Sequence, residues 1–504
     1  MQKEERKRIS LLVVAAFVVA TIAFVTLTPG FSFLEQFVRV GEEKPTTTEG
    51  ATYVGSIRCK QCHEGTYAGW KTTLHPYKIQ NIEDALVVGD FEKNNKLVIK
   101  KGDVEYTTTM SKKEGKYYIT TIGPDGKEHA YEVLYTLGSA WKQRYLTKFD
   151  NGEFHILPVQ WNIRDQKWQD YHGLEKYDYD DPKNYWSSRG RIWQYKCAGC
   201  HTTGFQINYD EVTDTYASTW IDNGVGCEAC HGPGSNHILA DIPYKKETIV
   251  NPAKIPQTDI GVMVCGSCHT RGHSTLDAKY GYPVGYKPGM NLVPLFDPVT
   301  REKDTPKRFW PSGDSRSHHQ QYLDWKTSEH ARVGIVCWDC HTVHSKGEGK
   351  FETKLAGTAL CKACHGEPRE VPGLAGLSHT IMDFGNCVGC HMPPTAKSIN
   401  PGDIRSHRFK VIKPEVSIKL LLDKAAKKDK TVLGFYGLEA KDVEGLNKTE
   451  VEELLKNKAR EAMYAGKTMD DLLWNVQPNS CNGCHHHVSP WILQEYLEPP
   501  RLHE

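Results

Sequence analysis

The sequence has 504 residues, 63 basic and 62 acidic side chains, a formal net charge of +1 and 39% hydrophobic residues. The balanced charge excludes the basic surplus typical of nucleic-acid-binding proteins and the high net charge of disordered chains. Sixteen cysteines are too few for a disulfide-stabilised scaffold of this length. The length itself allows roughly two to four domains.

The N-terminus is basic and then strongly hydrophobic. Met1–Arg8 carries four Lys or Arg and two Glu, and Ile9–Leu27 is a run of nineteen residues without a charge. Such a run can cross a hydrocarbon core of about 30 Å as a helix, with its basic end in the cytoplasm. A cleaved signal peptide is the alternative, but its hydrophobic region is normally shorter and is followed by a small-x-small site. We therefore expect an uncleaved membrane anchor over residues 1–29 and a polar linker over 30–52.

All sixteen cysteines belong to eight copies of one pattern, C-x-x-C-H. This pattern is the attachment signature of c-type haem, because two thiols at this spacing form thioethers with one porphyrin and the adjacent imidazole binds its iron. The predicted attachment cysteines are Cys59, Cys62, Cys197, Cys200, Cys227, Cys230, Cys265, Cys268, Cys337, Cys340, Cys361, Cys364, Cys387, Cys390, Cys481 and Cys484. The predicted proximal ligands are His63, His201, His231, His269, His341, His365, His391 and His485. The sequence thus predicts eight covalently bound haems c.

Other uses of paired cysteines fit the pattern poorly. Zinc ribbons combine two C-x-x-C pairs for each metal and need no histidine directly after each pair. Thioredoxin-like motifs do not recur eight times in one chain. Because covalent haem attachment takes place outside the cytoplasm, we expect the haem-bearing part on the extracytoplasmic side of the cell membrane, periplasmic or outer.

The first haem segment, residues 53–89, is followed by a β-rich and aromatic insertion over 90–195. Lys96–Met110 and Lys116–Gly138 alternate in the manner of strands, and Asp125-Gly126 is a hairpin-type turn. We predict a small antiparallel β region over 90–162. The following aromatic residues are expected to pack on porphyrin faces or on one another rather than to form a substrate cage.

Short spacings between motifs predict a core of six haems over 196–408, built from short helices and loops. Residues 409–504 are predicted to be helical and to carry the eighth haem. One helix is expected within Pro414–Lys428, and a second from a capping box formed by Thr449 and Glu452.

Of the 23 histidines, eight lie in motifs and fifteen remain, so a second axial ligand is available for every iron. The candidate distal ligands are His75, His237, His318, His330, His344, His379, His407 and His487, with His273, His319 and His486 as further choices. An axial methionine is the lesser option. An electron carrier is expected to have saturated irons, whereas an enzyme needs an open distal position.

Several haem segments resemble known families. CEACHGPGSNH, together with the spacing of Trp70 and His75, resembles the tetrahaem cytochrome of ammonia oxidisers and the larger multihaem cytochromes built on that core. CVGCHMPP followed by SHRF is similar to a segment of the pentahaem and octahaem nitrite reductases. CWDCHTVHS resembles a pattern of periplasmic and outer-surface electron-conduit cytochromes.

The sequence also departs from the enzymes of these families. Nitrite reductases carry lysine in place of the motif histidine at the catalytic haem, whereas all eight motifs here end in histidine. Hydroxylamine oxidoreductase keeps long helices after its last haem and a tyrosine cross-linked to one porphyrin, whereas nineteen residues follow His485 here. These departures favour a carrier, and no catalytic residue is predicted.

We expect a multihaem cytochrome c fold of short α-helices and irregular loops around haems, with a small antiparallel β insertion and one N-terminal transmembrane helix. The expected function is electron transfer along the haems in anaerobic respiration or extracellular electron transfer. The expected partners are other cytochromes or a quinol-oxidising membrane complex, and not nucleic acid. Two alternatives remain open. One is an oxidoreductase acting on nitrite, hydroxylamine or tetrathionate at a haem with an open distal site, and the other is a homo-oligomer, the protomer of a cytochrome filament.

Overall fold

The computed structural model describes residues 48–172, 183–348, 350–366, 387–465 and 476–483, and single positions beyond 465. The expected anchor Ile9–Leu27 lies outside these ranges, as do His379, Cys484, His485 and His487. Every helix within the described ranges is too short or too polar to span a bilayer. Gly50–Glu504 forms one unit by its internal contacts.

The first haem segment is helical. Its elements are α3 (Ser56–Lys60), α4 (Glu64–Trp70) and the short 3-10 helix η1 (His75–Tyr77). Trp70 is buried, and its indole nitrogen donates to the carbonyl of Val225 at 3.1 Å. This bond joins the first haem segment to the chain just before the third motif.

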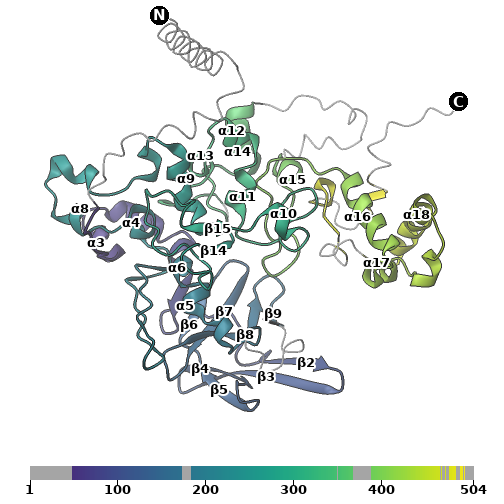
Figure 1. Ribbon diagram of the computed structural model, residues 1–504, viewed down its shortest axis with the longest axis horizontal. Coiled ribbons are helices and arrows are strands. Elements are labelled where there is room, and N and C mark those ends of the chain that lie inside the picture. The colour runs from purple at the N-terminus through teal and green to yellow at the C-terminus, as the bar shows by residue number, and fades with distance from the viewer. Residues whose placement is uncertain are drawn as a thin grey trace, which may run out of the picture. The chain divides into compact units, whose positions relative to one another are not determined.

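Two antiparallel sheets follow (Figure 1), which confirms the predicted antiparallel β structure. The four-stranded sheet has the order β2-β3-β4-β5, with β2 Lys96–Lys101, β3 Val104–Lys113, β4 Lys116–Ile122 and β5 Glu128–Glu132. The five-stranded sheet has the order β1-β6-β7-β8-β9, with β1 Ile79–Asn81, β6 Tyr135–Leu137, β7 Lys142–Lys148, β8 Phe154–Asn162 and β9 Lys167–Asp170. The predicted Asp125-Gly126 turn joins β4 to β5, where Gly126 has a φ of 74° that favours glycine. The edge strands β1, which pairs with β6, and β9, which pairs with β8, extend the β structure beyond 90–162 on both sides.

The sheets have an aromatic core of their own. The rings of Phe91, Tyr145 and Trp168 meet one another with centroids 5.2 to 5.4 Å apart. Trp161 packs against Trp168 at 5.2 Å, and the buried Trp186 packs against Tyr131 at 5.0 Å. Offset and edge contacts of this kind stabilise a core beyond the area they bury. These aromatic residues therefore pack on one another, one of the two predicted uses.

The middle of the chain consists of short helices, as predicted, and of two-stranded ribbons that were not predicted. The helices are η2 (Arg189–Arg191), α5 (Trp193–Lys196), α6 (Ala198–His201), α7 (Cys227–His231), α8 (Ser235–Leu239), η3 (Ile242–Glu247), η4 (Pro252–Lys254), α9 (Thr258–Gly266), α10 (Arg301–Asp304), α11 (Gln321–Trp325), α12 (Glu329–Arg332), α13 (Cys337–Cys340), α14 (Gly357–His365) and α15 (Cys387–His391). The ribbons pair β10 (Thr202–Thr203) with β13 (Asp222–Asn223), β11 (Tyr209–Asp210) with β12 (Thr215–Tyr216), and β14 (Gly272–Ser274) with β15 (Phe296–Pro298).

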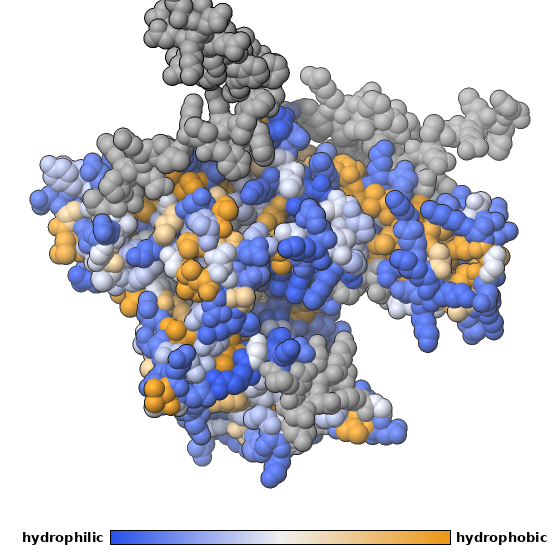
Figure 2. Space-filling model, viewed as in Figure 1, coloured by the Kyte–Doolittle hydropathy of each residue, from blue (hydrophilic) through white to orange (hydrophobic). Residues whose placement is uncertain are grey.

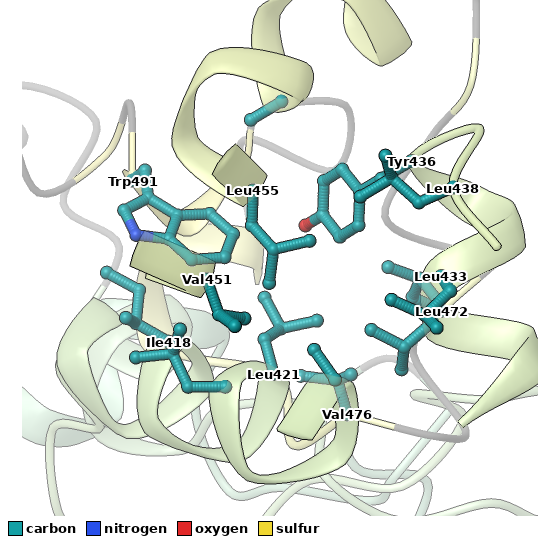
Figure 3. Close-up of a cluster of buried hydrophobic side chains, with 14 of the residues drawn as sticks. Ile418, Leu421, Leu433, Tyr436, Leu438, Val451, Leu455, Leu472, Val476 and Trp491 are labelled. Carbon is teal, nitrogen blue, oxygen red and sulfur yellow. The ribbon is translucent and has the colours of Figure 1, made fainter. Parts of the chain in front are cut away.

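The C-terminal segment is helical and has a separate hydrophobic core. Its elements are α16 (Pro414–Ala426), α17 (Lys430–Phe435), η5 (Ala440–Val443), α18 (Lys448–Tyr464) and η7 (Ser480–Gly483). Figure 3 shows Leu421, Val451, Leu455 and Tyr436 pointing toward a common centre, and each is at most 3% exposed. Figure 2 shows hydrophilic side chains over the outer side of these helices. The predicted helix in Pro414–Lys428 is therefore an amphipathic helix that packs on its own domain core.

The start of α18 differs from the prediction. Asn447 caps it, since its side-chain oxygen accepts from the amides of Thr449 at 3.0 Å and Glu450 at 3.1 Å. The Glu450 carboxylate accepts from the Asn447 amide at 2.7 Å and closes the capping box. The predicted box of Thr449 and Glu452 is therefore wrong by two residues, because asparagine caps a helix at least as well as threonine.

Candidate haem centres

Within the described residues, each C-x-x-C-H motif lies in a short helix or at one end of it. In the first motif the Cys62 amide donates to the Cys59 carbonyl at 3.2 Å, and the His63 amide donates to the same carbonyl at 2.9 Å. Residues three and four apart on a helix share one face, so such a turn presents two thiols and one imidazole together. The fifteen cysteines that the structure describes are all free of disulfide bonds. This donor set has the chemistry that covalent haem attachment requires.

Several of the predicted ligand imidazoles are held in one tautomer by backbone carbonyls. The Nδ1 atoms lie near the carbonyl oxygens of Lys78 (His201, 3.1 Å), Val250 (His231, 2.7 Å), Phe351 (His341, 2.9 Å), Lys245 (His237, 2.8 Å) and Arg405 (His407, 3.1 Å). A carbonyl oxygen can only accept, so in each case Nδ1 carries the proton and donates. The lone pair then lies on Nε2, the state in which an imidazole binds a metal.

The structure brings four motif histidines close to four of the candidate distal histidines, with nearly parallel rings in three pairs and nearly perpendicular rings in the fourth. The pairs, with the separation of ring centroids and the interplanar angle, are His63 with His237 (6.2 Å, 17°), His231 with His344 (5.8 Å, 16°), His365 with His330 (5.9 Å, 83°) and His341 with His407 (6.3 Å, 24°). An imidazole nitrogen lies about 2 Å from a bound metal and about 1.1 Å from its ring centre, so two rings opposed across one metal have centres about 6 Å apart. The four pairs therefore have the spacing that an iron between them would impose.

Each of these pairs joins segments that are remote in the sequence. His237 follows the third motif but faces the histidine of the first, and His344 follows the fifth motif but faces the histidine of the third. Proximity in the sequence is therefore no guide to which iron a distal histidine serves. The residues present fit haem c, with two thioether-forming thiols and two opposed imidazoles for each of these four motifs. The ligand roles themselves stay predictions.

The remaining candidate ligands are placed differently. His75 lies near His269 and His341, and burial together with nearby Lys78 lowers its pKa to about 3, which keeps the imidazole neutral. His318 Nε2 lies 2.9 Å from a guanidinium nitrogen of Arg271. Because a guanidinium only donates, His318 accepts this bond with the lone pair that a metal ligand would offer. His379 and His487 lie outside the described residues.

Thiols of different motifs meet in four places. The thiols that interact across motifs are Cys59 with Cys227, Cys200 with Cys268, Cys265 with Cys337, and Cys361 with Cys387. The thiols of Cys230 and Cys268 also interact, as do those of Cys340 and Cys364. The Ser480 hydroxyl, beside the eighth motif, donates to the Cys390 carbonyl at 2.6 Å.

These contacts give the motifs an order in space. Numbered along the sequence, motifs 1, 3, 4, 5, 6, 7 and 8 follow one another, and motif 2 lies beside motif 4. The order is not the sequence order, because motif 2 is displaced to one side. The sequence carries no sign of these contacts or of the carbonyls that orient the imidazoles, because backbone groups have no signature in the side-chain pattern.

Two family models match parts of the chain. The model of cytochrome c554 and c-prime matches residues 162–232, and the doubled CXXCH motif matches residues 330–370. These ranges contain motifs 2 and 3, and motifs 5 and 6.

Curated relatives match over part of their length. The cytochrome c nitrite reductase subunit NrfA of Nitratidesulfovibrio vulgaris is 24% identical over 183 residues, which cover 29% of this chain and 33% of that protein. The high-molecular-weight cytochrome c of the same organism is 26% identical over 208 residues, which cover 39% of this chain and 35% of that protein. The chain therefore spans about one third of the length of these relatives.

One solved structure has a similar fold. The crystal structure of the outer cell wall cytochrome OcwA aligns with a TM-score of 0.51 and 20% sequence identity. The alignment covers 88% of this chain and 100% of that one. At this identity the likeness concerns the fold alone.

Proposed function

We propose that this chain, a multihaem c-type cytochrome that binds haem covalently through its C-x-x-C-H motifs, carries eight haems and transfers electrons along them. When bound, haem supplies one-electron redox chemistry at its iron. The polypeptide holds each group by two thiols, orients its axial imidazoles and sets its surroundings.

The single observation that carries this proposal is the set of four opposed imidazole pairs, with centroids 5.8 to 6.3 Å apart. Two histidines at one iron fill both axial positions and leave no site for substrate. Such a centre changes little in structure when its charge changes, which favours electron transfer. The spatial order of the motifs supports the same function, because neighbouring attachment sites would bring neighbouring porphyrins together.

The proposed location and partners follow from the sequence. Ile9–Leu27 would anchor the chain in the cell membrane, with Gly50–Glu504 on the extracytoplasmic side. A quinol-oxidising membrane complex or another cytochrome would be the donor, and a further cytochrome or a terminal acceptor would take the electrons, in anaerobic respiration or extracellular electron transfer.

The experiment is intact-mass spectrometry and electron paramagnetic resonance of the holoprotein. We expect the mass of eight haems above that of the polypeptide, and low-spin ferric signals that account for at least the four paired centres. Fewer than eight haems would contradict the count. High-spin signals from most of the irons would contradict the carrier function.

An oxidoreductase is the second candidate, and one specific observation favours it. Arg144, Arg191 and Arg271 act electrostatically on Cys197 of motif 2, and among the described residues no aspartate or glutamate forms an ion pair with Arg144 or Arg271.

A further inference from the structure

Three strongly exposed hydrophobic side chains lie within six consecutive residues of the chain. Leu239, at the end of α8, is 83% exposed, and Ile242 and Tyr244, at the start of η3, are 84% and 61% exposed. We call these three residues the α8–η3 tip. Figure 1 shows α8 beside α3, and Figure 2 shows hydrophobic side chains at the same edge. Single exposed hydrophobic residues are common, whereas a group of them indicates a surface that something else covers.

Hydrogen bonds between η3 and α8 fix the backbone of the tip. The Lys245 ammonium donates to the carbonyls of His237 at 2.7 Å and Ile238 at 3.1 Å. The Nδ1 atom of His237 donates in return to the Lys245 carbonyl at 2.8 Å, and the Thr248 hydroxyl donates to the same carbonyl at 2.8 Å. The exposed side chains therefore extend from a fixed turn, which also carries the imidazole that pairs with His63.

The chain that follows the expected anchor enters the fold at the same element. The Thr52 amide donates to the Ser235 hydroxyl at 2.9 Å, and the Ser235 amide donates to the Thr52 carbonyl at 3.1 Å. The buried Glu228 carboxylate, in motif 3, accepts from the amides of Gly55 and Gly234, both at 2.7 Å. These bonds fix the point at which the chain enters the fold to the first residue of α8.

The number of residues before this entry point limits its distance from a membrane. Twenty-four residues, 28–51, separate Leu27, the end of the hydrophobic run, from Thr52. A chain of that length spans at most about 85 Å when it is fully extended. An anchor in the bilayer would therefore keep Thr52 within that distance of the membrane, whatever path the chain takes. Such confinement gives the tip a high effective concentration at the lipid surface, so that a few hydrophobic side chains suffice for docking.

The composition of the tip favours a lipid surface over a protein partner. A stable protein interface uses about 20–30 residues on each side, far more than the tip offers. Leucine and isoleucine insert into the boundary between headgroups and acyl chains, and tyrosine prefers the level of the headgroups because its ring is apolar and its hydroxyl polar. The charged residues of 238–248 have a net charge of zero and are Asp241, Lys245, Lys246 and Glu247. Docking would therefore depend on hydrophobic area and not on anionic lipids.

We propose that the α8–η3 tip docks on the extracytoplasmic surface of the membrane, with Leu239 and Ile242 in the acyl boundary and Tyr244 at the headgroups. The docking rests on the anchor in the proposed function, Ile9–Leu27, and not on the haem count. It brings the haem of motif 1 toward the bilayer, because His237, the candidate distal ligand of that haem, lies on α8. Motif 1 is one end of the spatial order of motifs, so electrons from a membrane donor would enter at that end.

The test is hydroxyl-radical footprinting of the full-length holoprotein, reconstituted at one copy per phosphatidylcholine nanodisc and read by mass spectrometry. We expect Tyr244 to be oxidised about tenfold more slowly than in the variant Leu239→Gln with Ile242→Gln, because docked side chains lose contact with water. The matched control is Leu86→Gln with Val212→Gln, since these positions are 75% and 95% exposed and lie outside α8 and η3. The control variant should leave Tyr244 as protected as in the unsubstituted protein.

Three results would overturn the docking. The first is equal oxidation of Tyr244 in the unsubstituted protein and the tip variant while both stay in the nanodisc, which would leave the anchor intact. The second is protection that appears only with two copies per nanodisc, which would assign the tip to a second copy of this chain. The third is release of the full-length chain from the nanodisc, which would contradict the anchor as well. Haem count and spin state test the carrier function separately, so docking and electron transfer can fail independently.

Discussion

At the scale of single residues, the opposed imidazoles depend on histidines that lie far from the motif they serve. His237 faces His63 across 174 positions of the chain. Its Nδ1 donates to the carbonyl of Lys245 at 2.8 Å, which orients the ring. Removal of such a side chain should change the axial ligation of one haem without releasing that haem, because its two thioether bonds hold it independently of the distal histidine.

We therefore expect His237→Ala to convert one centre from low-spin to high-spin while the haem count stays the same. Electron paramagnetic resonance would measure the spin state and intact mass the count. His129→Ala is the control, since His129 is exposed and bonded to Asp125 instead. A variant whose spectrum matches the unsubstituted protein would remove His237 from the set of predicted ligands.

A glycine on α4 tests the neighbouring pair of His231 and His344. A Cβ at Gly69 would lie 2.0 Å from the backbone oxygen of His344, so that backbone must move. Gly69→Ala should lower the free energy of unfolding by about 1–3 kcal/mol through overpacking and add high-spin signal at one centre. Gly65→Ala is the matched control on the same helix, because nothing lies within 4 Å of its Cβ position. Thermal unfolding and electron paramagnetic resonance would measure the two effects, and equal behaviour of both variants would contradict the expected contact.

The motif residues could be predicted from the sequence because the chemistry of attachment requires all three side chains at fixed spacing. The partner of each motif histidine could not, since His330, His344 and His407 reach their partners only through the tertiary fold. The contact between Thr52 and Ser235 was missed altogether. These residues are 183 positions apart and have no spacing that would signal a contact.

At the scale of elements, the strands and C-terminal helices follow from local patterns. Alternation over Lys96–Met110 and the Asp125-Gly126 turn predict the antiparallel strands because every second side chain packs inward. The pairing of β1 with β6 was not predictable, since three residues are too few to show a period. The start of α18 was misplaced because two sequence patterns typical of capping boxes overlap there, and it is the Asn447 side chain that binds the free amides.

The start of α17 gives a prediction about a helix and its pH dependence. Asp429 accepts from the amides of Thr431 at 3.0 Å and Val432 at 3.1 Å, and from Lys424 at 2.9 Å. Although burial acts to raise it, the bonds from Lys424 and the two amides hold the pKa of Asp429 below the ordinary 3.8. Asp429→Ala should cost about 1 kcal/mol of unfolding free energy at neutral pH.

The sign of the pH dependence follows from the lowered pKa. The stability contributed by ionised Asp429 is present above the ordinary pKa and is lost as the pH falls below it, because the unfolded chain binds the proton more readily. The difference between the variant and the unsubstituted protein should therefore shrink below about pH 4, as measured by thermal unfolding. Asp423→Ala, at an exposed position of α16, is the control and should show no such dependence. A difference that is constant with pH would contradict the assigned role.

At the scale of the whole molecule, the order of the motifs predicts which haem connects the two ends. Motif 5 lies between motif 4, through Cys265 and Cys337, and motif 6, through Cys340 and Cys364. Motif 2 contacts motif 4 alone among these pairs, through Cys200 and Cys268. Loss of the haem at motif 5 should therefore interrupt the electron-transfer path between motif 1 and motif 8, and loss of the haem at motif 2 should leave that path continuous.

We expect the variant Cys337→Ala with Cys340→Ala, fixed to an electrode near its N-terminus, to exchange electrons quickly with the haems of motifs 1–4 only. The matched variant Cys197→Ala with Cys200→Ala should lose one haem and retain rapid exchange with the other seven. Protein-film voltammetry would count the rapidly exchanging centres in each variant. Equal losses in the two variants would contradict the branched order.

The four thiol pairs between motifs have a consequence for how the protein matures. Before any porphyrin is attached, Cys59 and Cys227 carry free thiols, and the folded arrangement brings them together. Thiols in contact under oxidising conditions form a disulfide, and each such bond would remove one anchor from two different motifs. We therefore expect haem attachment to precede closure of the fold, which would make attachment of the haems and folding of the chain one ordered process.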